Sequence, residues 1–202
     1  MNVPRLPARV LRCFVATVAK ELGGEPFNAM LSISKLPLEW ASPQTFIKTD
    51  PHEAARIYAA LQAALRTYYG RGARGALIRV GENLWLRLLE DAPLNSRMHA
   101  ALIKRLPLAA RRKPTLDLLA KLLSAVPGDI TLHTLDLDLL LADHASPSTD
   151  GQSAPAPICY VTQGLIRESL RWATGHTFDV EETSCKAHGE QTCEFTITGG
   201  KM

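Results

Sequence analysis

The spacing of the apolar residues changes once along this chain of 202 residues, at about Asp129. Before that point they recur every three or four positions, which is typical of helices with one buried face. From Ile130 onward they alternate with polar residues, which is typical of half-buried strands. The pattern predicts one domain with a mainly helical part over residues 1–126 and a sheet part over residues 127–202, and this length suffices to bury a core.

Several helices are predicted in the first part. They cover residues 7–22, 51–69 and, as two or three helices broken at Pro93 and Pro107, 82–125. The helix over 51–69 has a clear start, because Asp50 can cap it, Pro51 suits its first position and Glu53 can complete the cap. Residues 25–49 contain three prolines and no helical period. An irregular or extended segment is therefore expected there.

Residues 70–75 read Gly-Arg-Gly-Ala-Arg-Gly and match the spacing of a dinucleotide-binding loop. In that loop a strand enters the glycine turn and a helix leaves it, with its N-terminus facing the pyrophosphate. Here a helix is expected to enter, and residues 76–80 leave as an apolar, strand-like run. We therefore interpret the segment as a flexible connector and predict no nicotinamide or flavin site, with an anion-binding loop as the alternative.

The overall charge of the chain does not indicate a strongly charged partner such as nucleic acid or a membrane surface. Lys and Arg total 23 against 20 Asp and Glu, a formal net charge of +3. The most basic stretch, residues 104–113, has no interleaved aromatic residues, so we interpret it as a solvated surface and expect neither nucleic acid nor a membrane as partner. The N-terminal residues lack the apolar core of a signal peptide, and a cytoplasmic protein is expected.

The sheet part is predicted to begin with strands over residues 130–143. Their alternation places Asp136 and Asp138 away from the core, which disfavours a catalytic carboxylate pair. Residues 145–157 contain three prolines and no large apolar side chain, so a mobile loop is expected.

A helix is predicted to follow, beginning near Pro157 and ending at Gly175. Gly164 lies in its middle, where glycine lowers helix propensity by about 1 kcal/mol relative to alanine. Its presence there indicates close packing against another backbone.

Three of the four cysteines lie in the last quarter of the chain, a segment too short to hold a core alone. Strand alternation places Glu182 and Cys193 on the buried side of a hairpin, with Cys185 in its turn. Cys159 lies in the first turn of the preceding helix. A lone buried carboxylate is costly unless it is neutralised or meets a cation.

We therefore predict a closed, structural zinc site with four protein ligands: Cys159, Glu182, Cys185 and Cys193. The spacing alone leaves buried free cysteines or a redox dithiol as alternatives. It also leaves His188 as a competitor of Glu182 for the fourth position.

The same stretch resembles the ending of the 4-vinyl reductase domain family, which is a glycine-containing helix, a glycine turn and then E-x-x-C-x-A-x-G-x-x-x-C-x-F. The match covers Gly164 to Gly175 and Glu182 to Phe195. The family includes phenol- and xylene-sensing modules of bacterial activators, stand-alone hydrocarbon-binding proteins and bacteriochlorophyll 4-vinyl reductases. The resemblance implies zinc on Cys159, Glu182, Cys185 and Cys193.

The resemblance also implies the fold class. This is an α/β (α+β) fold in which an antiparallel sheet packs with helices, shared with trafficking-complex subunits and nitric-oxide sensors. It further implies a homodimer formed through the N-terminal helices.

On these grounds we expect a zinc-stabilised protein that binds or senses a hydrophobic small molecule, aromatic or tetrapyrrole-like, and signals through a protein partner. The alternative is a 4-vinyl reductase, or an accessory protein, of bacteriochlorophyll biosynthesis. Enzyme activity is left open, and no catalytic residue is assigned. The ligand pocket is expected between the sheet and the helices, with these candidates: Trp85, His99, Leu132, Leu137, Tyr160 and Trp172.

Overall fold

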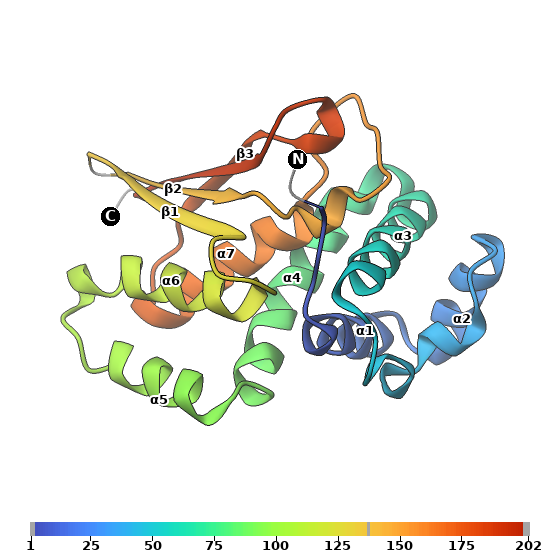
Figure 1. Cartoon of the computed structure of the whole chain (residues 1–202), viewed down its shortest axis with the longest axis horizontal. Coiled ribbons are helices and arrows are strands. Elements are labelled where there is room, and N and C mark those ends of the chain that lie inside the picture. The colour runs from blue at the N-terminus through green and yellow to red at the C-terminus, as the bar shows by residue number, and fades with distance from the viewer. Residues whose placement is uncertain (1–2, 137, 200–202) are drawn as a thin grey trace.

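The computed structural model describes residues 3–136 and 138–199 and shows a four-stranded antiparallel sheet with helices beneath it (Figure 1). The helices are α1 (Ala8–Leu22), α2 (Gly24–Ile33), α3 (Pro51–Tyr69), α4 (Ala73–Glu90), α5 (Leu94–Ile103), α6 (Arg112–Leu123) and α7 (Tyr160–Thr174). The strands are β1 (Ile130–Leu135), β2 (Asp138–Asp143), β3 (Asp179–Ser184) and β4 (Cys193–Thr198), in the order β1-β2-β4-β3. The predicted α+β fold class is confirmed.

The two central strands, β2 and β4, set which side chains face the helices. Leu141 pairs with Phe195 and Leu139 with Ile197, and all four side chains are buried. α6 contacts β1 and α7 contacts β3, so these helices cover the apolar face of the sheet (Figure 1). The antiparallel sheet thus has one face in the core, which is why its strands alternate in sequence.

Helices α4 and α7 make the most extensive contact between helices, and they meet at two glycines. A Cβ atom on Gly164 would lie 2.0 Å from the carbonyl oxygen of Ile78. A Cβ atom on Gly81 would lie 2.1 Å from the carbonyl oxygen of Val161. Only hydrogen fits at either position, so the backbones approach more closely than any other residue allows. The close approach predicted at Gly164 is confirmed, and its partner Gly81 is new.

The expectation of an irregular segment over residues 25–49 is wrong for its first part, because residues 24–33 form α2. Pro26 lies in the first turn, where its missing N–H costs no helical hydrogen bond. Phe27, Met30 and Leu31 are fully buried in the core that α2 shares with α1. Tertiary packing of these side chains therefore outweighs the weak helical period of the segment.

The strand-like run expected at residues 76–80 is also wrong, since these residues belong to α4. Leu77, Val80 and Leu84 are buried while Arg79 is exposed, which is the burial period of a helix. The glycine-rich segment before it joins two helices, α3 and α4. A strand does not enter it, so the dinucleotide-binding interpretation remains rejected.

The low-complexity loop over residues 145–157 was expected to be mobile, yet its first half is packed. Asp143 accepts a hydrogen bond from the backbone N–H of Ser146 at 2.7 Å, and Gln62 of α3 donates one to buried Ser148 at 3.1 Å. Farther along, the N–H of Ala154 donates to the carbonyl oxygen of Ala187 at 2.8 Å. Small polar side chains fit here because the surrounding structure supplies their hydrogen-bond partners.

Within residues 3–136 and 138–199, no helix is both long and apolar enough to cross a lipid bilayer.

Because α4 and α7 are in backbone contact, adding one methyl group at Gly164 is expected to destabilise the fold strongly. Gly164→Ala should lower the free energy of unfolding by about 3 kcal/mol or more, because the added carbon overlaps a backbone carbonyl. The matched control is Gly75→Ala, which lies within α4, where no atom is near the added carbon and alanine favours the helix. Urea unfolding of both variants measures the difference, and equal stability would contradict the close approach.

Candidate metal centre

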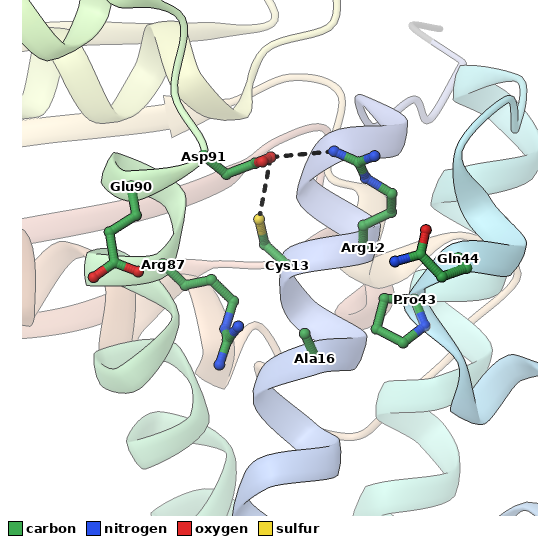
Figure 2. A pocket seen from close by; sticks show the side chains of 8 residues that line it. All are labelled: Arg12, Cys13, Ala16, Pro43, Gln44, Arg87, Glu90 and Asp91. Atoms are coloured by element: carbon green, nitrogen blue, oxygen red, sulfur yellow. Dashed lines mark hydrogen bonds and ion pairs between the residues drawn. The ribbon is translucent and has the colours of Figure 1, made fainter.

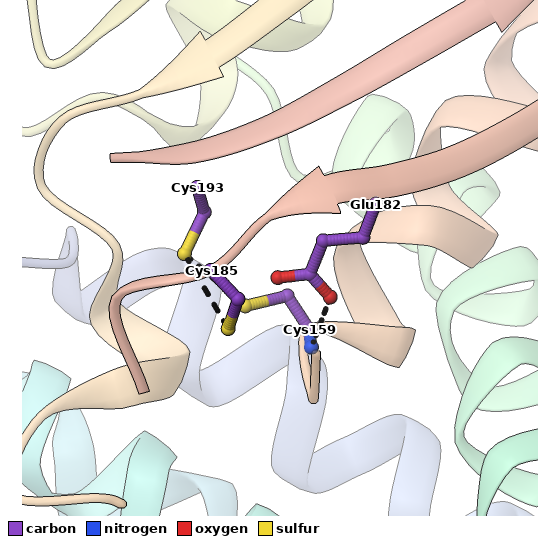
Figure 3. Close-up of side chains that lie close together, drawn as sticks. All are labelled: Cys159, Glu182, Cys185 and Cys193. Carbon is purple, nitrogen blue, oxygen red and sulfur yellow. Dashed lines mark hydrogen bonds between the residues drawn. The ribbon is translucent and has the colours of Figure 1, made fainter. Parts of the chain in front are cut away.

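Four side chains from three separate parts of the chain meet at one end of the sheet (Figure 3). Cys159 lies directly before α7, Glu182 is on β3, Cys185 follows the end of β3, and Cys193 begins β4. All four are buried, and their ligand atoms lie within 4.8 Å of one another. The structure therefore brings the four predicted residues together, and we call them the cysteine–glutamate cluster.

The connection between β3 and β4 has the local structure that turns Cys185 toward Cys193. A register shift between Glu182 and Ser184 bends β3 near its end. The backbone N–H groups of His188 and Glu190 donate to the carbonyl oxygen of Cys185 at 3.0 and 3.3 Å. Gly189 closes the turn with a φ of 104°, a left-handed conformation that favours glycine. The glycine of the sequence motif is thus required by the turn.

The distances between the ligand atoms suit a tetrahedral metal ion. The Sγ atoms of Cys159 and Cys193 are 3.6 Å apart, and those of Cys193 and Cys185 are 4.0 Å apart. Metal–sulfur bonds of about 2.3 Å at tetrahedral angles separate two sulfur atoms by roughly 3.8 Å. The cysteines therefore stand at the spacing that such an ion requires.

Glu182 approaches the cluster with one oxygen bonded and one left over. Its Oε2 accepts a hydrogen bond from the backbone N–H of Cys159 at 2.8 Å. Its Oε1 is buried and has no hydrogen-bond partner among the described residues. A buried acceptor without a partner is costly, and a cation among the sulfurs would satisfy it. The orphaned oxygen is the strongest local indication that the cluster holds an ion.

The pKa values of the cluster residues also indicate that a cation would be favourable there. Burial raises the pKa of Glu182 to about 8. The pKa of Cys159 is raised well above its usual value by hydrogen bonds to Cys185 and Cys193 and by burial. Cys185, which accepts hydrogen bonds from the other two thiols, has its pKa lowered instead. Of these groups only Cys185 favours its anionic form in the metal-free site. A bound metal ion would favour the anionic form of all four side chains.

The donor set fits a metal ion held only by the protein. Three thiolates and one carboxylate fill four positions, which leaves no open position for water or substrate. Such a closed centre stabilises structure rather than hydrolysing a substrate. His188, the competing ligand of the sequence analysis, is exposed and lies outside the cluster.

The fourth cysteine, Cys13, lies elsewhere, in a hollow of about 400 Å³ between α1 and α4 (Figure 2). Its thiol lies 3.7 Å from Asp91, which also pairs with Arg12 at 3.3 Å. Burial raises the pKa of the Cys13 thiol to about 11, so it stays protonated. Cys13 is a buried thiol with no part in the cysteine–glutamate cluster.

The residues predicted to line a ligand pocket are spread over the molecule. Trp85 of α4 is fully buried and meets Trp172 of α7 edge to face, with ring centroids 5.6 Å apart. Tyr160 lies in a groove of about 220 Å³ beside Glu182. His99 and Leu132 are partly buried, on α5 and β1. Leu137 lies outside the described residues. Their role in binding stays a prediction.

Two features of this region were missed in the sequence. The indole Nε1 of Trp85 is buried and has no hydrogen-bond partner among the described residues. Asp143 is buried opposite Cys193 in the sheet, where burial raises its pKa to about 6. Strand alternation could have indicated the burial of Asp143, but the isolation of an indole N–H depends on tertiary packing alone.

The fold is similar to that of several solved proteins. An H-NOX protein from S. oneidensis, in its Fe(II)NO ligation state, superimposes with a TM-score of 0.56 at 12% identity, over 100% of both chains. An unliganded Fe(II) H-NOX mutant from K. algicida gives 0.58 at 14% identity, over 96% of both. The phenol-responsive sensory domain of the transcription activator PoxR, solved with phenol, gives 0.52 at 17% identity, over 71% of this chain and 72% of that one. At these identities the likeness establishes the fold.

The chain therefore shares its fold with the H-NOX proteins and with the PoxR domain, and it has the buried cysteine–glutamate cluster at one end of the sheet. Residues 144–198 match the model of the 4-vinyl reductase domain, and this segment contains all four residues of the cluster. The match is confined to this C-terminal segment, and it agrees with the resemblance found in the sequence. No curated protein sequence matches the chain.

The cluster predicts opposite pH dependence of stability with and without metal. In the metal-free fold Glu182 keeps its proton up to about pH 8, whereas the unfolded chain releases it near the usual 4.5. The free energy of unfolding should therefore fall as pH rises between these values. With a divalent metal bound, protons compete with the ion, so stability should fall as pH is lowered.

Urea unfolding at pH 5, 6.5 and 8, with and without a chelator, measures both slopes. Asp143, whose pKa is raised to about 6 by burial, contributes to both series, so the difference between the slopes isolates the cluster. Identical slopes would show that no ion binds there.

Proposed function

We propose that this protein is a zinc-stabilised sensory protein that binds a hydrophobic small molecule, an aromatic or tetrapyrrole-like ring. The observation that carries the proposal is the buried cluster of three cysteines and one glutamate inside a 4-vinyl reductase domain. The alternative function is reduction of a vinyl group, which would need a hydride donor. No feature of the described residues favours a reductase over a binding protein.

Zinc is the metal that this donor set suits. Zinc accepts thiolate and carboxylate ligands and does not change its oxidation state. It is stable in a tetrahedral site with four protein ligands. The ion would join the start of α7 to the β3–β4 hairpin, in addition to the hydrogen bonds that Cys159 and Gln163 already donate to β3. Its role in the proposal is to stabilise the sheet end of the fold.

The ligand is proposed to bind between the sheet and the helices, near Trp85 and Trp172. PoxR, whose sensory domain has this fold, was solved with phenol. In the present chain the buried Trp85 N–H is a donor without a partner among the described residues. An aromatic molecule with an oxygen acceptor would contact both indole rings and satisfy that donor. His99, Leu132 and Tyr160 are proposed to contribute, and a homodimer or a protein partner to carry the signal onward.

Metal content tests the first half of the proposal. The purified protein should contain about one zinc ion per chain, measured by mass spectrometry. Cys185→Ser should lose it and unfold with about 3 kcal/mol less free energy, roughly 10 °C lower in Tm. Cys13→Ser is the matched control, because it removes a buried thiol outside the cluster and should keep the metal. A metal-free parent that is equally stable with chelator would refute the zinc centre.

Thermal melting with a panel of phenols, alkylbenzenes and vinyl tetrapyrroles tests the second half. A ligand that binds only the folded state raises Tm by an amount that grows with its concentration over Kd. Trp85→Phe keeps an aromatic ring but removes the N–H, and should weaken binding of an oxygen-bearing aromatic about tenfold. Trp40→Phe, a partly buried tryptophan packed on Phe46, is the control and should bind normally. Absence of any Tm shift up to solubility, or equal binding by both variants, would count against this pocket.

A further inference from the structure

Helix α5 carries three of its four large apolar side chains on the outside of the molecule. Leu94, Met98 and Leu102 are spaced four residues apart and form one row, with 70%, 60% and 58% of each residue exposed. The opposite face, which contacts the domain, consists of Ser96, Ala100 and Ile103. This departs from the usual arrangement of a surface helix, because only Ile103 among the large apolar residues of α5 faces the core. An exposed apolar row of this kind marks a contact surface.

The row continues into the connection between α5 and α6. Leu106 and Leu108 are 37% and 52% exposed there. Arg111 holds this connection in place by donating to the carbonyl oxygens of Lys104 and Leu106, and to that of Ala173 at the end of α7. The five apolar side chains therefore belong to one ordered region, which we call the α5 surface: Leu94, Met98, Leu102, Leu106 and Leu108.

The α5 surface lies in the most one-sided charge environment of the sequence. Residues 92–116 contain six basic residues and no Asp or Glu: Arg97, Lys104, Arg105, Arg111, Arg112 and Lys113. Arg97 and Arg105 are exposed beside the leucines. Lys104 lies 4.3 Å from the ring centroid of Trp172 and donates to the carbonyl oxygen of the same residue. The overall net charge of +3 conceals this local excess.

Composition and charge alone lead us to expect no membrane partner, but the exposed apolar row beside the basic stretch changes that expectation. We propose that the α5 surface docks on an anionic lipid bilayer, with the leucines and methionine inserted at the interface and the basic residues facing the headgroups. An exposed row of apolar side chains with basic residues beside it, here Arg97 on α5 and Lys104 and Arg105 after it, is the form that such peripheral contacts take. A second copy of this chain is disfavoured as the occupant, because the two surfaces would bring like charges together. Nucleic acid is disfavoured because five exposed apolar side chains would face phosphates.

The position of α5 in the fold permits this contact. In the view of Figure 1, α5 lies at the lower edge of the molecule, opposite the sheet, with no other element outside it. Its following loop is bonded to the C-terminal end of α7, whereas the cysteine–glutamate cluster lies at the N-terminal end of that helix. A flat surface can therefore meet α5 without covering the cluster.

Sedimentation with vesicles tests the proposal on the purified full chain. Vesicles of equal parts phosphatidylglycerol and phosphatidylcholine should bind the protein at low salt, and vesicles of phosphatidylcholine alone should bind it at least tenfold more weakly, on the order expected for the loss of surface charge. Met98→Glu and Leu102→Glu should each weaken binding to the anionic vesicles about tenfold or more. Arg97→Gln with Arg105→Gln should weaken it about tenfold and flatten its dependence on salt.

Matched controls separate docking from folding. Ile33→Glu changes an apolar side chain on α2 that is 71% exposed, and should bind vesicles as the parent does. Thermal melting should give the same Tm for all variants, because every substituted side chain is exposed. The proposal is overturned if the anionic vesicles do not bind the protein, if Met98→Glu and Leu102→Glu bind like Ile33→Glu, or if the α5 variants instead abolish self-association or binding to duplex DNA.

Discussion

The contact between the backbones of α4 and α7 is the constraint on which the rest of this structure depends. Gly81 and Gly164 allow the two helices to approach until a single Cβ atom would overlap a carbonyl oxygen. That approach fixes α7 beneath the sheet and thereby sets the position of Cys159 at its start. It also brings Trp172 against Trp85, so the cysteine–glutamate cluster and the aromatic pair are both placed by one glycine contact.

The cysteine–glutamate cluster shows how a short segment can be ordered at the end of a chain. Burying three thiols and a carboxylate together is unfavourable, since the pKa of Glu182 rises to about 8 and one of its oxygens lacks a partner among the described residues. A cation would remove both costs and add four coordination bonds, one to Cys159 at the start of α7 and three to residues of the hairpin. A site that is unfavourable without an ion and stabilising with one behaves as a structural metal centre.

Helix α7 also connects regions of different chemistry. Its first turn follows Cys159 of the cluster, its middle packs on α4, and its last carbonyl groups accept hydrogen bonds from Lys104 and Arg111 next to the α5 surface. A sensory domain needs a ligand site and an output surface held in a defined relation. In this chain α7 contacts both the proposed ligand site, through the ring of Trp172, and the α5 surface, through the carbonyl oxygens of Trp172 and Ala173.

Much of the site was predictable because it depends on local pattern. Strand alternation places Glu182 and Cys193 on the same buried face, and the lowered helix propensity at Gly164 indicates a close approach before its partner is known. The structure alone decided the features that depend on packing between distant segments. Burial of Phe27, Met30 and Leu31 against α1 makes a helix of a proline-containing segment, and hydrogen bonds from α3 order a loop with low-complexity composition.

The sequence by itself thus determined the order of most helices and strands, because local periodicity sets it. It indicated the four residues of the cluster through spacing and the family resemblance, with His188 left as a competitor of Glu182 until the structure placed His188 outside the cluster. Only the tertiary structure decided that Gly81 meets Gly164, that Trp85 has no acceptor among the described residues and that α5 turns its leucines outward. Each of these depends on which neighbour occupies the adjoining space.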